Sequence, residues 1–559
     1  MSYRVGVVGA GPRGLGALEA LVFSLSQAKM DCLVDVFDPT EHPGAGPNFC
    51  PDQSDLCLLN IPVRALDIAP LKFSGSEAGT FESWSKTAFD PNAFPPRSDI
   101  GRYLHARFLS LQHYMGRPEG ITDIRAHISQ AYQRDGSWWL VSDGHEHGPY
   151  SEILLAQGQP QTALDPQMDR WQAHAKENCL DLLPAYPANR LLSAASAWAG
   201  KTVAIRGLGL STLDVVRLLT IGVGGRFEDG GYIASGKEPR RIMPFSLDGH
   251  PPVPKPQTAE LDALFDPNAA ETRNFEFALE QAVSRAPEQA LQCICDAIVA
   301  PATRILSACD GTNGQPAVEE WLKQEVAQPG SQANGAALDV LKTGIDMALG
   351  RALPTAGYVV GQIWRKWQNE LRQGVNTSAH RPDTMKAIIG FDEGLKRFSY
   401  GPPVSSAQEL LILAQAGIVD MQVVDDPNVI MNDDGWRLID DDVSSQVSVM
   451  IDAVISSPDL STVTEPLLSS LRECGAVVVV AEGLGARTNA DGQIVGSDGE
   501  TKPGLYLLGR QALGSVIAAD SLHDCFGASA TRWAQGVVDR VQTDDRFAAV
   551  ADAPKTASL

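Results

Sequence analysis

The sequence predicts an α/β protein in which two βα units, each with a glycine-rich turn, are separated by a long helical insertion. The first unit opens the chain: an apolar run at residues 5–8 leads into closely spaced glycines, a helix-like stretch and a second apolar run. The second unit begins near residue 201 and has the same order. Between about residues 259 and 373 the apolar spacing is helical and glycine-rich turns are missing. Strands that alternate with helices predict parallel sheets.

Length and composition limit the class of protein. A chain of 559 residues with 44% hydrophobic residues is long enough for two or three packed domains. Its net charge of −23 disfavours nucleic acid and anionic membranes as partners. The chain enters its first strand without a signal peptide, and no membrane span is expected. The nine cysteines have neither redox nor zinc spacing, so we expect reduced thiols, no bound metal and a cytoplasmic location.

The first glycine-rich turn has the spacing Gly-x-Gly-x-x-Gly. Gly9 permits the tight turn after the strand, Gly11 lets a pyrophosphate approach the backbone, and Gly14 allows close packing of helix on strand. Asp38 ends the second apolar run and can accept hydrogen bonds from ribose hydroxyls. The free N–H groups of the helix start would face the phosphates. We therefore expect a dinucleotide site; the alternative is an ordinary βα turn without a ligand.

A second turn of similar form follows residues 201–206. It contains Gly207, Gly209 and Ser211, with Thr212 in place of the third glycine, which predicts slightly looser packing. Two such turns in one chain predict two nucleotides, one held permanently and one that visits. A structural turn without a ligand is the alternative here as well.

Two late segments are expected to complete the first sheet. Residues 150–158 and 504–510 each have the pattern of a strand that ends in a glycine turn, at Gly158 and Gly509. An apolar, small-residue helix is expected from about residue 521 to 540, and it would begin near Asp520. The alternative for Asp520 is a helix N-cap with no other role.

Five stretches of the chain resemble a known group of flavoproteins. They cover residues 9–14, 44–62, 96–104 and 207–214, with support from 504–533. The sequence is similar to FAD/NAD(P)-binding proteins related to N-hydroxylating and class B flavin monooxygenases. It looks most like the bacterial subgroup that includes nitrosuccinate synthase (aspartate N-monooxygenase) and one kind of FAD-dependent urate hydroxylase. The resemblance implies two Rossmann-like dinucleotide-binding domains, with FAD at the first turn and NAD(P)H at the second.

Composition and resemblance together divide the chain into five segments. The FAD-binding domain is expected to contain residues 1–165 and 456–559, and the NAD(P)H-binding domain residues 166–256 and 381–455. Residues 257–380 form the helical insertion, which would cover the active site or form a subunit interface; a homo-oligomer is left open. Its helices are expected at residues 274–285, 287–300, 317–326, 334–350 and 358–372.

The resemblance also assigns residues around the flavin. Gly44 and Gly46 would line its approach, and Asn60 would stand near the isoalloxazine or the substrate. Arg97 would reach a phosphate or the polar edge of the flavin through charge-assisted contacts. Tyr103 would pack near the adenosine. The alternative for Arg97 is a surface ion pair.

Two arginines are the candidates for coenzyme choice. Close relatives often carry a Ser-Arg pair in the stretch 243–252, but here Leu247 follows Ser246. Arg240 and Arg241 lie just upstream and would hold a 2′-phosphate, which favours NADPH over NADH. The alternative is that both are solvated surface charges.

The expected activity is flavin monooxygenation. Asn60 and His523 are the candidates for contact with the reacting groups, although a capping or core histidine is the alternative for His523; His250 is a further histidine of interest. NAD(P)H would reduce the FAD, and O2 would supply the oxygen transferred to a small substrate. An amine nitrogen of an amino acid or related metabolite is the first choice of acceptor and a urate-like ring carbon the second. An NAD(P)H:flavin oxidoreductase and a non-catalytic nucleotide sensor remain the other hypotheses.

Overall fold

The first sheet carries the first glycine turn and is built from both ends of the chain. The computed structural model describes residues 3–71, 78–115, 120–310, 314–332, 335–376 and 380–543. The strands of this sheet are β1 (Arg4–Val8), β2 (Leu33–Phe37), β3 (Ile121–Ile124), β7 (Glu152–Leu155), β17 (Gln493–Val495) and β18 (Thr501–Leu507). Their order is β17-β18-β7-β1-β2-β3, and only β17 runs antiparallel to its neighbour. The expected return of the two late segments to this sheet is confirmed.

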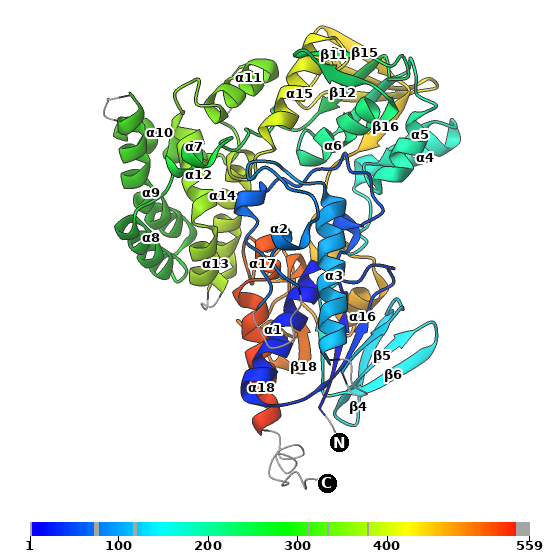
Figure 1. Cartoon of the computed structure of the whole chain (residues 1–559), viewed down its shortest axis with the longest axis vertical. Coiled ribbons are helices and arrows are strands. Elements are labelled where there is room, and N and C mark those ends of the chain that lie inside the picture. The colour runs from blue at the N-terminus through cyan, green and yellow to red at the C-terminus, as the bar shows by residue number, and fades with distance from the viewer. Residues whose placement is uncertain are drawn as a thin grey trace.

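Helices from the two ends of the chain pack side by side against this sheet. Figure 1 shows α1 (Pro12–Ala28) in dark blue beside α18 (Ala528–Thr543) in red. Helix α3 (Arg97–Met115) packs near α1 and belongs to the same apolar core. These contacts join residues about 500 positions apart, so the FAD-type domain forms only when both ends of the chain come together.

The second sheet is parallel and carries the second glycine turn. Its strands are β8 (Asp181–Pro184), β9 (Thr202–Arg206), β12 (Arg241–Phe245) and β16 (Val449–Asp452). They lie in the order β12-β9-β16-β8. The helices of this domain are α4 (Pro166–Glu177), α5 (Ala188–Ala195), α6 (Leu210–Leu219) and α15 (Val404–Gln415). Two parallel α/β units confirm the predicted fold class.

The helical insertion forms a separate layer beside both sheets, drawn in green in Figure 1. Its helices are α7 (Ala259–Ala263), α8 (Ala269–Ala282), α9 (Pro287–Asp310), α10 (Gln315–Ala327), α11 (Ala337–Ala348), α12 (Ala356–Lys366), α13 (Gln368–Asn376) and α14 (Pro382–Ser399). Helix α14 packs on α9 and α12, so the helical layer continues past the expected boundary at residue 380. Trp364 and Trp367, at helical spacing, are buried in its core.

Two details differ from the sequence-based expectation. Helix α9 is, over Pro287–Cys309, long and apolar enough to cross a membrane, with 56% of its most apolar window buried inside the protein. It packs against α8, α10, α12 and α14 as the central helix of the insertion. The expected helix at 521–540 is broken into α17 (Leu522–Cys525) and α18, because the chain turns at Phe526 and Gly527.

Small antiparallel sheets and short helices complete the fold. They are β4 (Gln130–Arg134), β5 (Ser137–Ser142) and β6 (His145–Tyr150); β10 (Arg226–Glu228) and β11 (Gly231–Ile233); β13 (Asn428–Asn432), β14 (Gly435–Asp440) and β15 (Val443–Val447); α2 (Phe81–Trp84) and α16 (Pro466–Glu473).

Candidate functional site

The three glycines of the first turn have different structural roles. Gly9 has a φ of +98°, and a Cβ there would lie 2.6 Å from the Ala156 carbonyl oxygen. A Cβ on Gly14 would lie 2.1 Å from the carbonyl oxygen of Gly9, so α1 packs on its strand only without a side chain. Gly11 is the N-cap of α1, has ordinary dihedral angles and leaves room for a Cβ. Gly9 and Gly14 are therefore required by the fold, whereas Gly11 keeps space open at the helix start.

A second glycine loop lies directly against this turn. The N–H of Gly44 donates to the Ala10 carbonyl at 2.5 Å, and Gly44 has a φ of +96°. A Cβ on Gly46 would meet the Cα of Gly11 at 3.2 Å. The two loops bring bare backbone together at the N-terminus of α1, where a phosphate group can approach N–H donors closely.

Asp38 follows β2 and is hydrogen-bonded to the first glycine turn. Its Oδ2 accepts a hydrogen bond from the Ala10 N–H at 2.7 Å, and its Oδ1 accepts from the N–H and hydroxyl of Thr40 at 2.9 and 2.5 Å. A carboxylate offers about four acceptor positions. Three are used within the protein, so Asp38 first holds the glycine loop in place and has one position left for a ribose hydroxyl.

Residues at the carboxyl ends of β7 and β18 fit a flavin nucleotide. Gly158 and Gly509 have φ values of +74° and +100° and end these strands. Near them, Gln157 Oε1, Arg510 Nε and both amide atoms of Gln511 are buried without a hydrogen-bond partner in the described part of the chain. Buried polar groups rarely stay unpaired in a native protein. Together with the bare glycine loops, these unused donors and acceptors suit the phosphates and the polar ring edge of FAD.

Arg97 and Tyr103, on α3, have partners within the protein. Arg97 forms a buried ion pair with Asp214 and donates to the Tyr186 hydroxyl at 2.8 Å. Asp214 belongs to α6, so this pair joins the two nucleotide-binding domains, and the buried Nε of Arg97 has no hydrogen-bond partner in the described part of the chain. The Tyr103 ring is fully buried, and its hydroxyl donates to the Gly79 carbonyl at 2.8 Å. The structure thus gives both residues a role in packing and domain contact.

The second turn reproduces the first with one exchange. Gly207 has a φ of +115°, Gly209 is the N-cap of α6, and Ser211 lies in the first turn of that helix. Thr212 takes the third glycine's place, and its hydroxyl donates to the Gly207 carbonyl at 2.7 Å. This hydrogen bond closes the turn. A side-chain contact is therefore found where looser packing was expected.

The position of Arg240 and Arg241 does not fit the role expected of them. In the register of β12 and β9, Arg241 lies opposite Thr202 at the start of both strands. Phe245 lies opposite Arg206 at their ends, next to the Gly207 turn. Because Arg241 and Phe245 are four residues apart on β12, Arg241 lies roughly 13 Å from that turn. Ligands of such sheets bind at the carboxyl ends of the strands. Arg240 donates to the Thr202 hydroxyl instead, and Arg241 pairs with Asp420 on the surface.

A cavity of about 500 Å³ opens beside the second turn. It lies between that turn, the linker after β12 and the helical insertion. Its lining residues are Leu208, Gly209, Leu210, Ser246, Asp248, His250, Pro252, Pro329, Gly330, Gly390, Glu393, Gly394, Lys396, Arg397 and Tyr400. The residues that follow β12 therefore line this cavity, and they occupy the position after their strand that Asp38 occupies after β2. His250 contributes a ring whose Nε2 lies 3.1 Å from the Gly335 carbonyl oxygen of the insertion.

A charged wall connects this cavity with the C-terminal segment. Lys396 pairs with Asp520 at 2.8 Å and with Glu393 at 2.7 Å. Burial alone would raise the pKa of Asp520, but Lys396 and Arg510 together hold it below its usual value. Asp520 is thus an ionised partner of Lys396, and the N-cap of α17 is Ser521, whose hydroxyl oxygen accepts from the His523 N–H at 3.2 Å.

Asn60 begins the loop 60–65, and His523 contacts the end of this loop at Ala65. The backbone carbonyl of Asn60 accepts a hydrogen bond from the Nζ of Lys255 at 2.7 Å. The His523 Nε2 lies 2.9 Å from the carbonyl oxygen of Ala65. Burial lowers the pKa of His523, so the ring is neutral at neutral pH with Nε2 as donor. The structure therefore brings both candidate residues to the loop 60–65 together with Lys255, which the sequence analysis did not identify.

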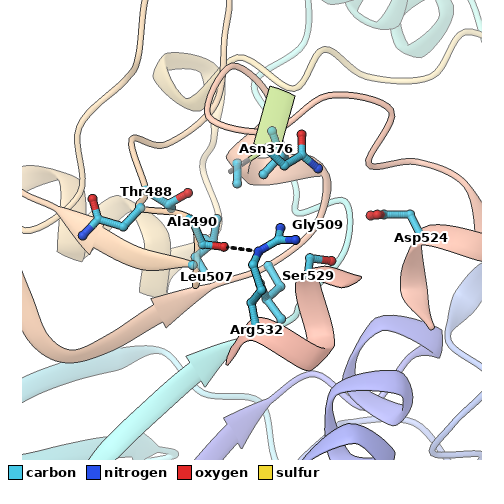
Figure 2. A pocket seen from close by; sticks show the side chains of 13 residues that line it. Asn376, Thr488, Ala490, Leu507, Gly509, Asp524, Ser529 and Arg532 are labelled. Atoms are coloured by element: carbon cyan, nitrogen blue, oxygen red, sulfur yellow. Dashed lines mark hydrogen bonds between the residues drawn. The ribbon is translucent and has the colours of Figure 1, made fainter. Parts of the chain in front are cut away.

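A buried cluster of charges was also missed. Asp524 accepts from Arg13 at 2.5 Å and lies 3.6 Å from Arg372 of α13. Arg13 stands inside the first glycine motif and also donates to the Ala519 carbonyl at 2.9 Å. Figure 2 shows Asp524 at one side of a hollow of about 10 Å³, with Asn376 of the insertion and Arg532 of α18 around it. The only sequence signal was an arginine between two motif glycines.

Known proteins are similar to this chain over its N-terminal part and over most of its length. Residues 6–160 match a family model described as FAD-NAD(P)-binding. A nitrosuccinic acid synthase from Aspergillus oryzae is 27% identical over 544 residues, covering 84% of this chain and 81% of that protein. A nitrosuccinate-forming L-aspartate N-monooxygenase from Streptomyces davaonensis is 29% identical over 280 residues, which are 43% of this chain and 42% of that protein.

One solved structure can be compared along almost the whole chain. The reduced form of ornithine hydroxylase from Pseudomonas aeruginosa is 12% identical, covers 97% of this chain and 100% of its own, and has a TM-score of 0.48. The N-terminal part of this chain therefore contains an FAD/NAD(P)-binding domain, and the chain is similar to proteins named for nitrosuccinate formation and aspartate N-oxygenation.

Proposed function

We propose that this protein is an FAD-dependent, NAD(P)H-consuming monooxygenase that uses O2 to hydroxylate the amine nitrogen of a small amino acid, with L-aspartate as the first candidate. The observation that carries the proposal is a chain with two glycine turns at the ends of two parallel sheets and a cavity that extends from the second turn to α14 of the insertion. Its curated relatives are named for nitrosuccinate formation and aspartate N-oxygenation.

The chain's own residues divide the work between the two turns. Gly11 and Gly46 keep backbone N–H groups open to the FAD pyrophosphate, and Gly209 does the same for the visiting coenzyme at α6. When bound, FAD supplies the electron transfer and oxygen activation that side chains lack. Lys396 lines the cavity, and its ion pair with Asp520 joins the cavity wall to the C-terminal segment.

In this proposal the helical insertion covers the site, which is supported by its contribution to the cavity wall. Residues of α14 line the cavity, and Arg372 of α13 donates to the Ala518 carbonyl at 3.1 Å. A closed site excludes water, which keeps activated oxygen from being lost as H2O2. All nine cysteines are free, which suits a reducing cytoplasm. The reaction needs no nucleic acid, membrane or metal partner.

Coupled oxygen transfer is the test of this function. FAD-loaded protein is mixed with NADPH or NADH, ¹⁸O2 and a panel of L-aspartate, other amino acids, polyamines and purines. We expect faster coenzyme oxidation with an amino acid and an N-hydroxylated product that carries ¹⁸O. Label on a purine carbon would assign a ring-carbon hydroxylase, and H2O2 without labelled product would assign a reductase. Failure of either coenzyme to bleach the flavin would leave a nucleotide sensor.

A further inference from the structure

Lys255 is a lysine deep in the protein without a carboxylate partner. It lies in the proline-rich linker that enters the insertion, and its Nζ donates to the Asn60 carbonyl at 2.7 Å. Within the described part of the chain, no acidic oxygen lies within 4.0 Å of this nitrogen. A buried ammonium group with a single neutral acceptor is unfavourable, because it has lost water without gaining an opposite charge.

Most cations around Lys255 have a carboxylate partner. Arg365 and Lys366 of α12 both pair with Asp262. Lys396 pairs with Asp520, and Arg372 lies beside Asp524. Lys255 and Arg64 depart from this pattern, because within the described residues Arg64 donates only to the neutral oxygens of Asn92, Pro256 and Gln257. These two cations indicate that a negative partner is supplied from outside the chain.

Two charges act on Lys255 with opposite sign. Arg365 on α12 repels the protonated lysine and Asp262 on α7 attracts it. His523 on α17 is neutral because burial lowers its pKa, and Arg372 and Asp67 act on it with opposite sign. Lys255 and Arg64 are therefore the cations of this segment that lack a carboxylate partner in the described part of the chain. Burial, with a smaller effect from Arg365, lowers the pKa of Lys255 to about 7.

Lys255 also borders accessible space. The side chain keeps part of its surface exposed although protein surrounds it, and Asn60 and His523 are half-buried in the same way. Pro252 of the same linker lines the 500 Å³ cavity. A group of this kind can be reached by a small molecule and can bind it without competing bulk water.

We propose that Lys255 anchors a carboxylate of the substrate, which restricts the enzyme to amines that carry a carboxylate group. This inference rests on the proposed function and names the substrate class of that site. A carboxylate supplies negative charge beside Lys255, where the described part of the chain supplies no carboxylate partner. The substrate's own ammonium group is excluded from this position, because it would meet a like charge. Above neutral pH, binding must take up a proton, since the anion favours the charged lysine.

Substrate binding to FAD-loaded, oxidised protein tests the proposal without turnover. Calorimetry with L-aspartate is performed on the wild type, Lys255→Met, Lys255→Arg and the control Lys366→Met. We expect binding about ten- to a hundredfold weaker in Lys255→Met, as for loss of a charge-assisted contact. Lys255→Arg should recover part of the affinity and Lys366→Met should bind as the wild type. At pH 8, titrations in buffers of different ionisation enthalpy should show proton uptake that Lys255→Met lacks.

Contrary results are distinct from failure of the proposed function. Unchanged affinity in a folded Lys255→Met protein, or an equal loss in Lys366→Met, would overturn the anchor. Normal affinity with a lost pH dependence of kcat would overturn it too, because Lys255 would then move a proton. If the wild type oxygenates ethylamine as well as L-aspartate, the carboxylate requirement fails while the monooxygenase function stands. If no amine is oxygenated but L-aspartate binds through Lys255, the function fails and the anchor stands.

Discussion

At the scale of the residue, Lys255 links the site to the stability of the whole protein. Its pKa is about 7 in the folded protein, well below the ordinary lysine value of 10.5. Between these two pH values the unfolded chain binds more protons than the folded one, so wild-type stability rises with pH across this window. Below pH 7 the buried charge is fully present and its cost is greatest.

Lys255→Met should therefore raise the melting temperature, and the increase should be larger at pH 6 than at pH 9.5. Thermal unfolding of both proteins across this range, followed by circular dichroism, measures the difference. Lys502→Met serves as control, because Lys502 pairs with Asp498 on the surface. A constant difference at every pH would mean that Lys255 titrates normally.

Asp248 is the residue expected to influence coenzyme choice. It lies three residues beyond β12 and borders the cavity beside the second turn, and its Oδ1 accepts from the Ser246 hydroxyl at 2.6 Å. An exposed carboxylate here repels a 2′-phosphate by roughly 1 kcal/mol. Asp248→Asn should raise the affinity for NADPH about fivefold relative to NADH. Coenzyme dissociation constants for the variant and for Asp425→Asn, on the neighbouring loop, decide this; equal changes for both coenzymes would contradict it.

At the scale of the element, the two glycine turns make separable predictions. A Cβ at Gly11 would meet Gly46 at 3.6 Å, and one at Gly209 would meet nothing within 4 Å. Both sites therefore have room for a Cβ in the fold, so we expect the loss in a valine variant to fall mainly on the ligand. Gly11→Val should purify without yellow FAD, whereas Gly209→Val should keep FAD and need much more NAD(P)H for reduction.

Absorbance at 450 nm and the rate of anaerobic flavin reduction read out these two variants. Gly200→Ala, which has a positive φ and open space just before β9 and away from both turns, controls for strain alone. Full flavin content in Gly11→Val would assign the first turn a structural role only. Unchanged reduction kinetics in Gly209→Val would do the same for the second turn.

These turns also show what sequence reasoning can reach. A motif such as that of Gly9 and Gly14 encodes a local backbone need, so its position after a strand and before a helix was predictable. Contacts between segments that are far apart in the sequence cannot be predicted from the local sequence around either segment. The partner of Arg13 is 511 residues away, and the register that places Arg241 far from the Gly207 turn depends on how two strands align. Lys255 was missed for the same reason, because its isolation exists only in three dimensions.

At the scale of the whole molecule, buried ion pairs connect the domains. Arg97 of the FAD-type domain pairs with Asp214 of the second domain, and Asp214 also accepts from the Tyr186 hydroxyl at 2.6 Å. The C-terminal segment is joined to the first turn and to the insertion through Asp524. The two clusters tie together all three parts of the protein around the proposed FAD site.

Asp524→Asn should loosen this assembly at its centre. Arg13 and Arg372 would both lose their buried counter-charge, which for a broken buried pair costs about 3–5 kcal/mol. Because Arg13 lies inside the first glycine motif, FAD retention should fall along with the melting temperature. Asp498→Asn, which removes an exposed carboxylate paired with Lys502, should change stability by about 1 kcal/mol or less. Flavin fluorescence released during a thermal ramp measures both effects together. If Asp524→Asn releases FAD at the wild-type temperature, the three-way contact through Asp524 does not hold the cofactor domain together.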